Sequence, residues 1–239
     1  FHGRVVGLGI LVARPGIRHG WLTSRNLFLH TTGDPDIDEI TIEYNGFLTD
    51  RTLSQRVVSR LIGFLVSDGG DWEEFYIDVA TKAGIYRDIT LPGVSLSSRL
   101  RQFHYVDLDE MRALSKDYLS CISQGTRYNI RRSLKEYQKF GDVVFDVAGN
   151  VSQALAFLEG LKVLHQTRWC AKGEKGSFAN DLFESFHDRL VRTRFEHNEI
   201  QLVRVRAGDR VLGYLYNLNH QGHVYNYQTG FDYAMCEKH

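Results

Sequence analysis

Phenol groups near the end of the chain have the chemistry to move a proton. The segment "HVYNYQTG" places Tyr225 and Tyr227 two residues apart, so on a β-strand both side chains point to the same side. A phenol at such a position can donate a proton to a leaving group, but tyrosine is also a favoured residue for plain sheet packing. Asn226 and Gln228 alternate with the tyrosines and point to the other side, where an amide pair is either solvated or lines a binding cleft.

A carboxylate in the first half of the chain is another candidate for proton transfer. Glu43, in "TIEYNG", lies near the end of a predicted strand over residues 38–45 and just before a predicted helix. A carboxylate there can act as a general base or bind an acceptor group, and the same pattern also fits an ordinary surface strand. Tyr227 and Glu43 are therefore our candidates for catalytic residues.

Positive side chains gather on a predicted helix over residues 126–140. They are Arg127, Arg131 and Lys135 at every fourth position, with Arg132 and Lys139 beside them and Glu136 among them. Such a helix face is either solvated or an anion site, and arginine makes the bidentate contacts to phosphate that lysine does not make. We name Arg127, Arg131 and Arg132 as candidate anion-binding residues.

An aromatic pair ends the long helix predicted over residues 151–169. His165 and Trp169 are four residues apart, so they are neighbours on one helix face. The polar, glycine-containing segment "CAKGEKGSFAN" follows them, and such loops often carry function. The sequence leaves two interpretations open for this pair: the floor of a substrate cleft or an anchor in the core.

The elements that must position these candidates follow from two periodicities. Alternating or β-branched apolar residues predict strands over 4–12, 26–33, 38–45, 74–80, 104–108, 142–148, 200–206, 210–220 and 223–230. Apolar residues at every third or fourth position predict helices over 109–120, 126–140, 151–169 and 181–197, and one between a cap at Thr49 or Asp50 and a stop at Gly69. The mixture predicts an α/β fold.

A short repeat links the two ends of the chain. The segments "GRVVGLGILV" over Gly3–Val12 and "DRVLGYLYNL" over Asp209–Leu218 share Arg, Val and Gly in step. After each copy comes a turn and then a second predicted strand that ends in Thr-Gly. We interpret the repeat as a duplicated α/β unit, whose two copies are expected to occupy matching places in similar sheets.

The composition and charge of the chain limit the partners, metal sites and cellular locations that we expect. Basic and acidic residues number 29 each, so the formal net charge is zero and DNA is not an expected partner. The three cysteines lack metal-ligand spacing, so we expect free thiols and no metal site. The apolar runs are shorter than the about 20 residues that cross a bilayer, and we see no leader sequence, so we expect a cytoplasmic protein without a transmembrane segment.

The second half of the chain carries a resemblance to a known family. Its segments are "TRYNIRRSLKEYQKFGDVVFDV", "LHQTRWCAKGEKGSF" and "RVLGYLYNLNHQGHVYNYQTGFD". Together they resemble GNAT-superfamily acyltransferases of the CelD-type (cellulose-biosynthesis) group, which are related to the FemAB peptidyltransferases. The resemblance covers nearly the whole chain and is clearest after residue 99.

The resemblance implies a fold and an activity. It implies tandem GNAT-like halves at residues 1–98 and 99–239, each a mixed, mostly antiparallel sheet flanked by helices, with the start of the first half and the end of the second half missing. It also implies an acyltransferase of EC class 2.3.1. Such an enzyme would move an acetyl or other acyl group from acyl-CoA to an amine or hydroxyl of a small molecule or sugar precursor, in polysaccharide or cell-envelope metabolism.

The resemblance also suggests roles for the candidate residues. Tyr227 would give a proton to the leaving thiolate, and Glu43 would take one from the acceptor. The arginines of 126–140 would bind phosphates of CoA, of a nucleotide-sugar acceptor or of tRNA. A further set, His165, Trp169, Tyr225 and Gln228, would line the substrate site.

Two alternative functions remain open. In the superfamily the donor pyrophosphate binds backbone amides where a loop meets a helix after the fourth strand. The equivalent segment in the first half, "NGFLTDRTLSQ", has no glycine-rich loop, which favours a catalytically inactive GNAT-like scaffold. The basic helix favours a Fem-like transferase that uses aminoacyl-tRNA. The acceptor and the oligomeric state do not follow from the sequence.

Overall fold

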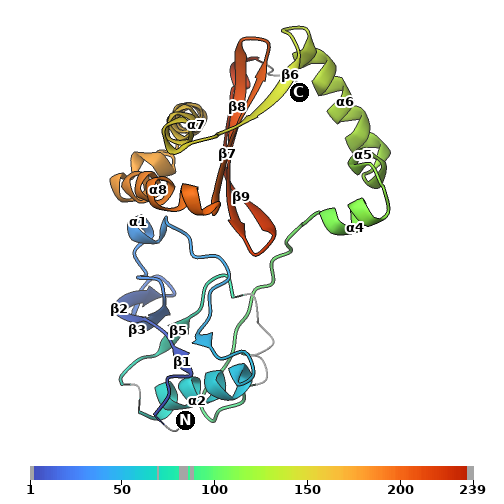
Figure 1. Cartoon of the computed structure of the whole chain (residues 1–239). Helices are drawn as coiled ribbons and strands as arrows, with labels where there is room; N and C mark the ends of the chain where they lie inside the picture. The colour runs from blue at the N-terminus through green and yellow to red at the C-terminus, as the bar shows by residue number, and fades with distance from the viewer. Residues whose placement is uncertain (1–2, 69, 81–85, 87–88, 236–239) are drawn as a thin grey trace. The chain divides into compact units, whose positions relative to one another are not determined.

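The chain forms two compact units in the computed structural model, one over Phe1–Gln102 and one over Phe103–His239 (Figure 1). The structure describes residues 3–68, 70–80, 86 and 89–235. Each unit combines helices with small sheets that are mostly antiparallel. The predicted mixed α/β class is therefore confirmed, and we describe each unit by itself.

A four-stranded sheet forms the centre of the C-terminal unit. Its strands are β6 (Val143–Val147), β7 (Ile200–Ala207), β8 (Arg210–His220) and β9 (His223–Phe231), antiparallel in the order β6-β7-β8-β9. The turn between β8 and β9 needs positive φ at Gln221 (47°) and Gly222 (80°), which is the geometry of tight hairpin turns. The sequence prediction of these four strands is confirmed to within a residue or two at the ends.

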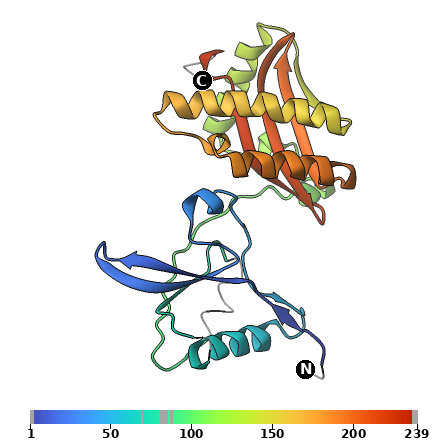
Figure 2. The ribbon, with the colours of Figure 1, turned by 90° about the vertical axis from the view of Figure 1, so that its left-hand side faces the viewer.

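Two long helices, α7 (Val151–Ala171) and α8 (Asp181–Arg194), cover one face of this sheet (Figure 2). Each has an asparagine cap: the Asn150 side chain accepts from the Gln153 amide, and the Asn180 side chain accepts from the amides of Leu182 and Phe183. Short 3-10 turns, η1 (Ser177–Ala179), η2 (Phe195–His197) and η3 (Tyr233–Met235), complete the unit's second half.

Glycines allow α7 to approach the sheet closely. A Cβ atom on Gly230 of β9 would lie 2.6 Å from the Leu161 carbonyl oxygen of α7. A Cβ atom on Gly160 would lie 2.4 Å from the ring of Tyr214. The clash at Gly230 is with backbone, so that position requires glycine, whereas at Gly160 the ring of Tyr214 would have to shift to admit a side chain. The close approach places the middle of α7 against β8 and β9.

Helix α6 (Gln124–Gln138) lies on the other side of the sheet from α7 and α8 (Figures 1 and 2). It follows two short helices, α4 (Leu108–Ala113) and α5 (Tyr118–Cys121). The Ser123 hydroxyl caps α6 by accepting from the Thr126 amide. None of the α6 residues is buried, so the helix presents most of its surface outward.

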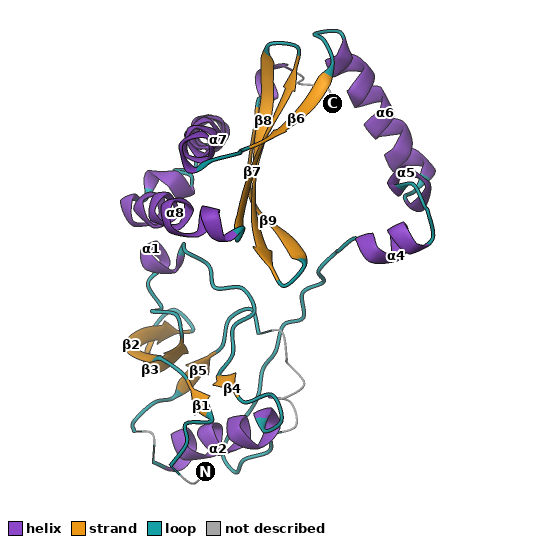
Figure 3. Ribbon diagram, in the orientation of Figure 1, coloured by secondary structure: helices purple, strands orange, loops and turns teal. Residues whose placement is uncertain are grey.

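The N-terminal unit contains a hairpin, a crossover helix and a small second sheet (Figure 3). Its elements are β1 (Gly7–Leu8), β2 (Leu11–Arg18), β3 (Leu22–Leu29), α1 (Pro35–Asp38), β4 (Leu48–Thr49), α2 (Ser54–Ser67) and β5 (Glu74–Tyr76). Strands β2 and β3 are antiparallel, and β5 pairs with β3 in parallel after α2. Val57, Val58 and Leu65 of α2 are buried, and so are Leu27 and Leu29 of β3.

The predicted strand over residues 38–45 is wrong. The structure has α1 at Pro35–Asp38 and irregular backbone after it. The Asp38 carboxylate accepts hydrogen bonds from the amides of Thr32 and Gly33 and from the Thr32 hydroxyl. Such local side-chain bonds to the backbone compete with strand pairing, so the alternation of apolar residues did not produce a strand.

The predicted strand over residues 104–108 is also wrong. Asp107 caps α4 by accepting from the Glu110 amide, and Tyr105 is 86% exposed with no strand beside it in the described chain. The helix predicted over 109–120 is divided into α4 and α5 at Ser115, which has a positive φ of 48°. The side-chain cap and the αL residue together set these boundaries.

The predicted match between Gly3–Val12 and Asp209–Leu218 is wrong. Within the first segment, β1 pairs with β4 in a two-stranded sheet, and only its last residues enter β2, an edge strand of another sheet. The second segment lies almost entirely in β8, an internal strand of the four-stranded sheet. The shared residues therefore do not mark matching strands, and a GNAT-like origin of the N-terminal half stays a prediction.

Candidate functional site

A buried histidine joins two tyrosines in the C-terminal unit. His187, on α8, is 1% exposed. Its Nδ1 atom lies 3.2 Å from the hydroxyl of Tyr216 on β8, and its Nε2 atom lies 3.2 Å from the hydroxyl of Tyr227 on β9. Both distances fit hydrogen bonds. The three side chains therefore form a continuous hydrogen-bonded chain, which we call the Tyr-His-Tyr cluster.

A β-bulge aims Tyr227 at this cluster. In the pairing of β8 with β9, Tyr216 lies opposite Gln228 and Asn217 lies opposite Asn226, so Tyr227 is the extra residue on β9. A bulge re-aims a side chain and is common beside active sites. The bulge explains how the Tyr227 hydroxyl reaches a histidine that also contacts the neighbouring strand.

Aromatic rings surround His187. The ring centroids nearest to it belong to Phe183 at 4.4 Å, Tyr227 at 4.9 Å, Phe186 at 5.0 Å, Tyr216 at 5.5 Å and Phe178 at 6.4 Å. These rings come from η1, α8, β8 and β9. Their apolar surface excludes water from the imidazole, so electrostatic interactions are stronger there than in solvent.

Burial keeps His187 neutral. Desolvation, with a smaller effect of the positive charge on Lys162, lowers the pKa of His187 to about 4. Lys162 stays charged because its ammonium group contacts the carboxylates of Glu184 at 2.8 Å and Glu159 at 3.3 Å. Desolvation, and then the nearby Tyr227, raises the pKa of the Tyr216 hydroxyl above its ordinary value. At neutral pH the cluster therefore holds a neutral imidazole beside a protonated Tyr216.

Of the tyrosines and the glutamine predicted on β9, the structure brings only Tyr227 into the Tyr-His-Tyr cluster. Tyr225 is half-buried nearer the hairpin turn, where its ring stacks on His223 with centroids 6.1 Å apart. Gln228 is half-buried and lies opposite Tyr216 in the sheet register. Asn226 bonds to Asn217 at 3.0 Å, so this amide forms a polar contact across the sheet.

A surface hollow of about 420 Å³ lies at the first two turns of α6 and is lined by Gln124, Arg127, Tyr128 and Arg131. These residues share one helix face. The Arg127 Nη2 group donates to the Ile122 carbonyl at 3.2 Å, and its Nε atom is buried without a partner in the described chain. Two guanidinium groups at one hollow make it suitable for an anion.

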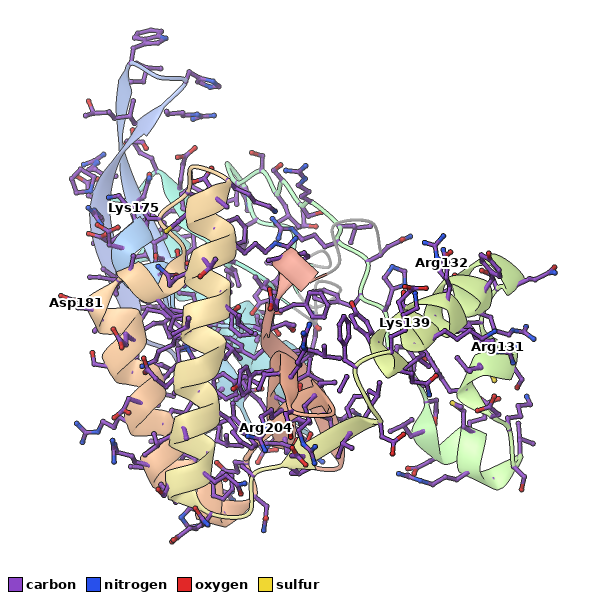
Figure 4. The ribbon with its side chains drawn as sticks, turned by 90° about the horizontal axis from the view of Figure 1, so that it is seen from above. Arg131, Arg132, Lys139, Lys175, Asp181 and Arg204 are labelled. Atoms are coloured by element: carbon purple, nitrogen blue, oxygen red, sulfur yellow. The ribbon has the colours of Figure 1, made fainter. Side chains whose placement is uncertain are left out.

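The other predicted basic residues lie along the same helix. Arg131 and Arg132 are both exposed on α6, but Arg132 is not among the residues that line the hollow (Figure 4). Lys139, just after α6, pairs with Glu136. The predicted basic helix is therefore confirmed as a surface feature, and Arg127 and Arg131 are the members that share a concave site.

Of the predicted aromatic pair on α7, His165 lies in the core and Trp169 lies at the surface. His165 is 5% exposed and packs edge-on against Phe178 with ring centroids 5.2 Å apart. Trp169 is 36% exposed, and the Lys172 ammonium lies 5.0 Å from its ring centroid. Phe178 also contacts His187, so His165 belongs to the core next to the Tyr-His-Tyr cluster.

Glu43 lies in the N-terminal unit. It is exposed on irregular backbone, not at a strand end as predicted. The helix that follows begins at Ser54, and its N-cap Leu53 has no side-chain hydrogen bond. Neither predicted cap holds the helix, because the Asp50 carboxylate instead bonds to the amide and hydroxyl of Thr52, and Thr49 bonds to the Ser54 hydroxyl.

Sequence reasoning missed His187 and Tyr216. A weak signal was present, because His187 is four residues from both Phe183 and Val191 and therefore lies on the apolar face of α8. A histidine on an apolar helix face needs a hydrogen-bonding partner in the core. The partners come from β8 and β9, at sequence distances of 29 and 40 residues, and no local pattern identifies them.

No candidate metal or membrane element emerges from the residues that the structure describes. In residues 3–68, 70–80, 86 and 89–235, His, Cys, Asp and Glu do not form a group of three that could hold a metal ion. No helix in the same ranges is both long enough and apolar enough to cross a bilayer. Cys121 and Cys170 are exposed free thiols, and Cys236 lies outside the described residues.

Comparison with known proteins identifies the class of the C-terminal unit. Residues 124–239 match the family model described as acetyltransferase (GNAT) domain. No curated protein matches the chain. A GNAT acetyltransferase domain therefore occupies residues 124–239, which include the Tyr-His-Tyr cluster and the α6 hollow. This domain implies acyl-CoA-dependent acyl transfer, an activity of EC class 2.3.1.

Proposed function

We propose that this protein transfers an acetyl or other acyl group from acyl-CoA to an amine or hydroxyl of a small molecule or sugar precursor. Polysaccharide or cell-envelope metabolism is the proposed setting, on the resemblance to CelD-type proteins. The observation that carries the proposal is the match of residues 124–239 to the GNAT acetyltransferase domain. The position of Tyr227 at a bulge within that domain supports it.

The proposed reaction is direct attack in a ternary complex of enzyme, donor and acceptor. A lone pair of the acceptor nitrogen or oxygen forms a bond to the thioester carbonyl carbon, and the carbon–sulfur bond then breaks. Tyr227 gives its hydroxyl proton to the leaving thiolate. Glu43 is the proposed base that removes the acceptor proton.

The α6 hollow is the proposed site for the donor phosphates. Arg127 and Arg131 supply charge and bidentate donors, and the ring of Tyr128 offers a flat surface for a base or sugar. Arg132 is the proposed outer contact. At the acceptor side, Trp169, Tyr225 and Gln228 are the proposed lining residues, whereas the burial of His165 favours a role in holding Trp169 and Phe178.

The first test is calorimetry of the full chain with acetyl-CoA. We expect saturable binding, and we expect Arg131→Ala to weaken it about 10-fold to 100-fold because a charge-assisted phosphate contact contributes roughly 1.5–3 kcal/mol. Arg192→Ala is the matched control, since Arg192 is an exposed arginine of the same unit that pairs with Asp188. The absence of binding heat at millimolar acetyl-CoA would remove the proposal.

The basic helix favours one second candidate function, aminoacyl transfer from charged tRNA. Five basic residues lie on or next to α6, which are Arg127, Arg131, Arg132, Lys135 and Lys139. Binding of tRNA would fall steeply with salt, because it releases counterions. Thermal shifts measured with CoA and with tRNA at two salt concentrations distinguish the candidates. A shift with neither ligand would favour the inactive scaffold.

A further inference from the structure

We propose that His187 is a positioning residue that donates its Nε2–H group to the Tyr227 oxygen, and that the buried Tyr216 hydroxyl fixes this direction. The proposal deepens the proposed function, because it rests on Tyr227 as the acid of acyl transfer. It assigns a role to two residues, His187 and Tyr216, that lie behind the reacting group. It also explains why a polar chain crosses an aromatic core.

The proton count of the imidazole limits which hydrogen bonds His187 can make. A neutral histidine carries one N–H donor and one bare nitrogen that accepts. His187 lies between two hydroxyl groups, at 3.2 Å on each side. The histidine can therefore donate to one tyrosine and accept from the other, but it cannot donate to both while neutral.

The burial of Tyr216 decides which nitrogen of His187 carries the proton. This side chain is 0% exposed, and in the described chain its hydroxyl has His187 Nδ1 as its only hydrogen-bond partner. If Nδ1 carried the proton, the Tyr216 hydrogen would have no acceptor in a water-excluded core, which is costly. The favoured arrangement is therefore Tyr216 O–H donating to Nδ1, with the imidazole proton on Nε2.

The charged groups around His187 influence its protonation state. The titratable groups that act on it directly are Tyr216 and Tyr227 on the sheet and Lys162 on α7. Glu184 bonds to Lys162, and His165 packs on Phe178, whose ring also contacts His187. The ammonium group of Lys162 disfavours a second positive charge, and Glu184 is engaged by that same ammonium group. Both effects keep the imidazole neutral, which preserves the single direction of the hydrogen-bond chain.

This arrangement determines which way the hydroxyl group of Tyr227 points its hydrogen. Its oxygen accepts from the Nε2–H group, so its own hydrogen is directed away from His187. When Tyr227 gives that proton to the thiolate, the O–H bond breaks, an S–H bond forms, and the phenolate oxygen keeps the hydrogen bond from Nε2. A hydrogen bond to the charged form stabilises it, so His187 makes proton release by Tyr227 easier without moving a proton of its own.

The direct test is the tautomer of His187, measured by nitrogen-15 NMR on the full chain. We expect a proton on Nε2 and a bare Nδ1 between about pH 6 and 8. A proton on Nδ1, an even mixture of tautomers or an imidazolium ion in this range would overturn the proposal. Tyr216→Phe should shift the signals toward a mixture, whereas Tyr214→Phe, the same change two residues away on β8, should leave them unchanged.

The kinetic test compares two replacements of His187. In His187→Gln the side-chain amide keeps an N–H donor for Tyr227, and in His187→Phe no donor remains. With acetyl-CoA as donor, we expect His187→Phe to lower kcat about 100-fold with little change in KM, and His187→Gln to recover at least a tenth of the wild-type kcat. Equal losses in two folded variants would overturn the role as donor.

The two readouts separate this proposal from the proposed function. If the wild-type chain releases no CoA with any amine or sugar acceptor, the acyltransferase proposal fails, but the tautomer still tests the direction of the chain. If the enzyme turns over and the proton is on Nδ1, this inference alone fails. In a Tyr227→Phe background, His187→Phe should cause no further loss of kcat, because both changes act through one hydroxyl group.

Discussion

At the scale of single residues, His187 links the chemistry of the C-terminal unit to its acid stability. Its pKa is lowered from 6.5 to about 4, first by desolvation and then by Lys162. The unfolded chain therefore binds a proton between these pH values that the folded chain does not bind. The stabilisation is fully present above pH 6.5 and is lost progressively as the pH falls to about 4.

We predict that acid destabilises the wild-type unit more than the His187→Gln variant. The pKa difference corresponds to about 3 kcal/mol of unfolding free energy across this window. Urea unfolding at several pH values measures it for both proteins. Paired carboxylates such as Asp146, whose pKa is lowered by hydrogen bonds from Arg206 and Arg204, contribute equally to both proteins. Parallel curves for the two proteins would contradict the prediction.

A second prediction at this scale concerns Glu43. We expect Glu43→Gln to lower kcat about 100-fold, because Glu43 is the proposed base. Glu39→Gln is the matched control, because Glu39 is an exposed glutamate of the same segment. Steady-state release of CoA measures both variants. An unchanged kcat for Glu43→Gln would contradict the proposed role of Glu43 as the base.

At the scale of elements, the approach of α7 to β9 depends on a missing side chain. A Cβ atom on Gly230 would lie only 2.6 Å from the carbonyl oxygen of Leu161. Backbone atoms do not move aside as a flexible side chain can. A methyl group there must push the helix from the sheet, and the hydroxyl groups of Tyr216 and Tyr227 would shift relative to His187 on α8.

We predict that Gly230→Ala destabilises the unit by about 2 kcal/mol, in the range of overpacked sites. Gly125→Ala is the control, because Gly125 is in helix α6 and a Cβ atom there meets nothing within 4 Å. That change should stabilise the protein by about 0.5–1 kcal/mol, since alanine loses less backbone entropy in a helix. Thermal or urea unfolding measures both. A neutral Gly230→Ala would contradict the close packing.

The same elements show what the sequence could and could not predict. Helix α2 was predicted because its apolar residues recur at every fourth position, and helices were also predicted at α6, α7 and α8. The strand expected at 38–45 failed because the Asp38 carboxylate organises a local turn. The bulge at Tyr227 leaves no local signature, since it depends on the register between β8 and β9. Tyr227 was a predicted candidate, but its contact with His187 depends on this bulge and could not be predicted from the sequence.

At the scale of the whole molecule, the chain contains two units with separate cores. The C-terminal unit buries Leu158, Leu161, Phe183 and Leu202 between its helices and its sheet. The N-terminal unit buries the apolar faces of β3 and α2. Each unit therefore has buried apolar residues of its own, as a domain does. The GNAT match lies entirely within the second unit.

We predict that a fragment of residues 103–239 folds by itself. It should unfold in one cooperative transition and keep the nitrogen-15 signals of His187, because the Tyr-His-Tyr cluster draws only on α8, β8 and β9. Circular dichroism and NMR on the fragment check this expectation. A fragment without a cooperative transition would show that the N-terminal unit is needed for the fold.

The most direct test of the account is acyl transfer by the full chain, with wild type and Tyr227→Phe compared. Release of free CoA from acetyl-CoA, measured over a panel of amines and sugars, gives kcat, and calorimetry gives Kd. We expect the variant to bind acetyl-CoA as tightly as wild type and to turn over 100-fold to 1,000-fold more slowly, because a positioned general acid contributes roughly that factor. A variant as fast as wild type would contradict the role of Tyr227, and a wild-type chain that neither binds nor consumes acetyl-CoA would contradict the account as a whole.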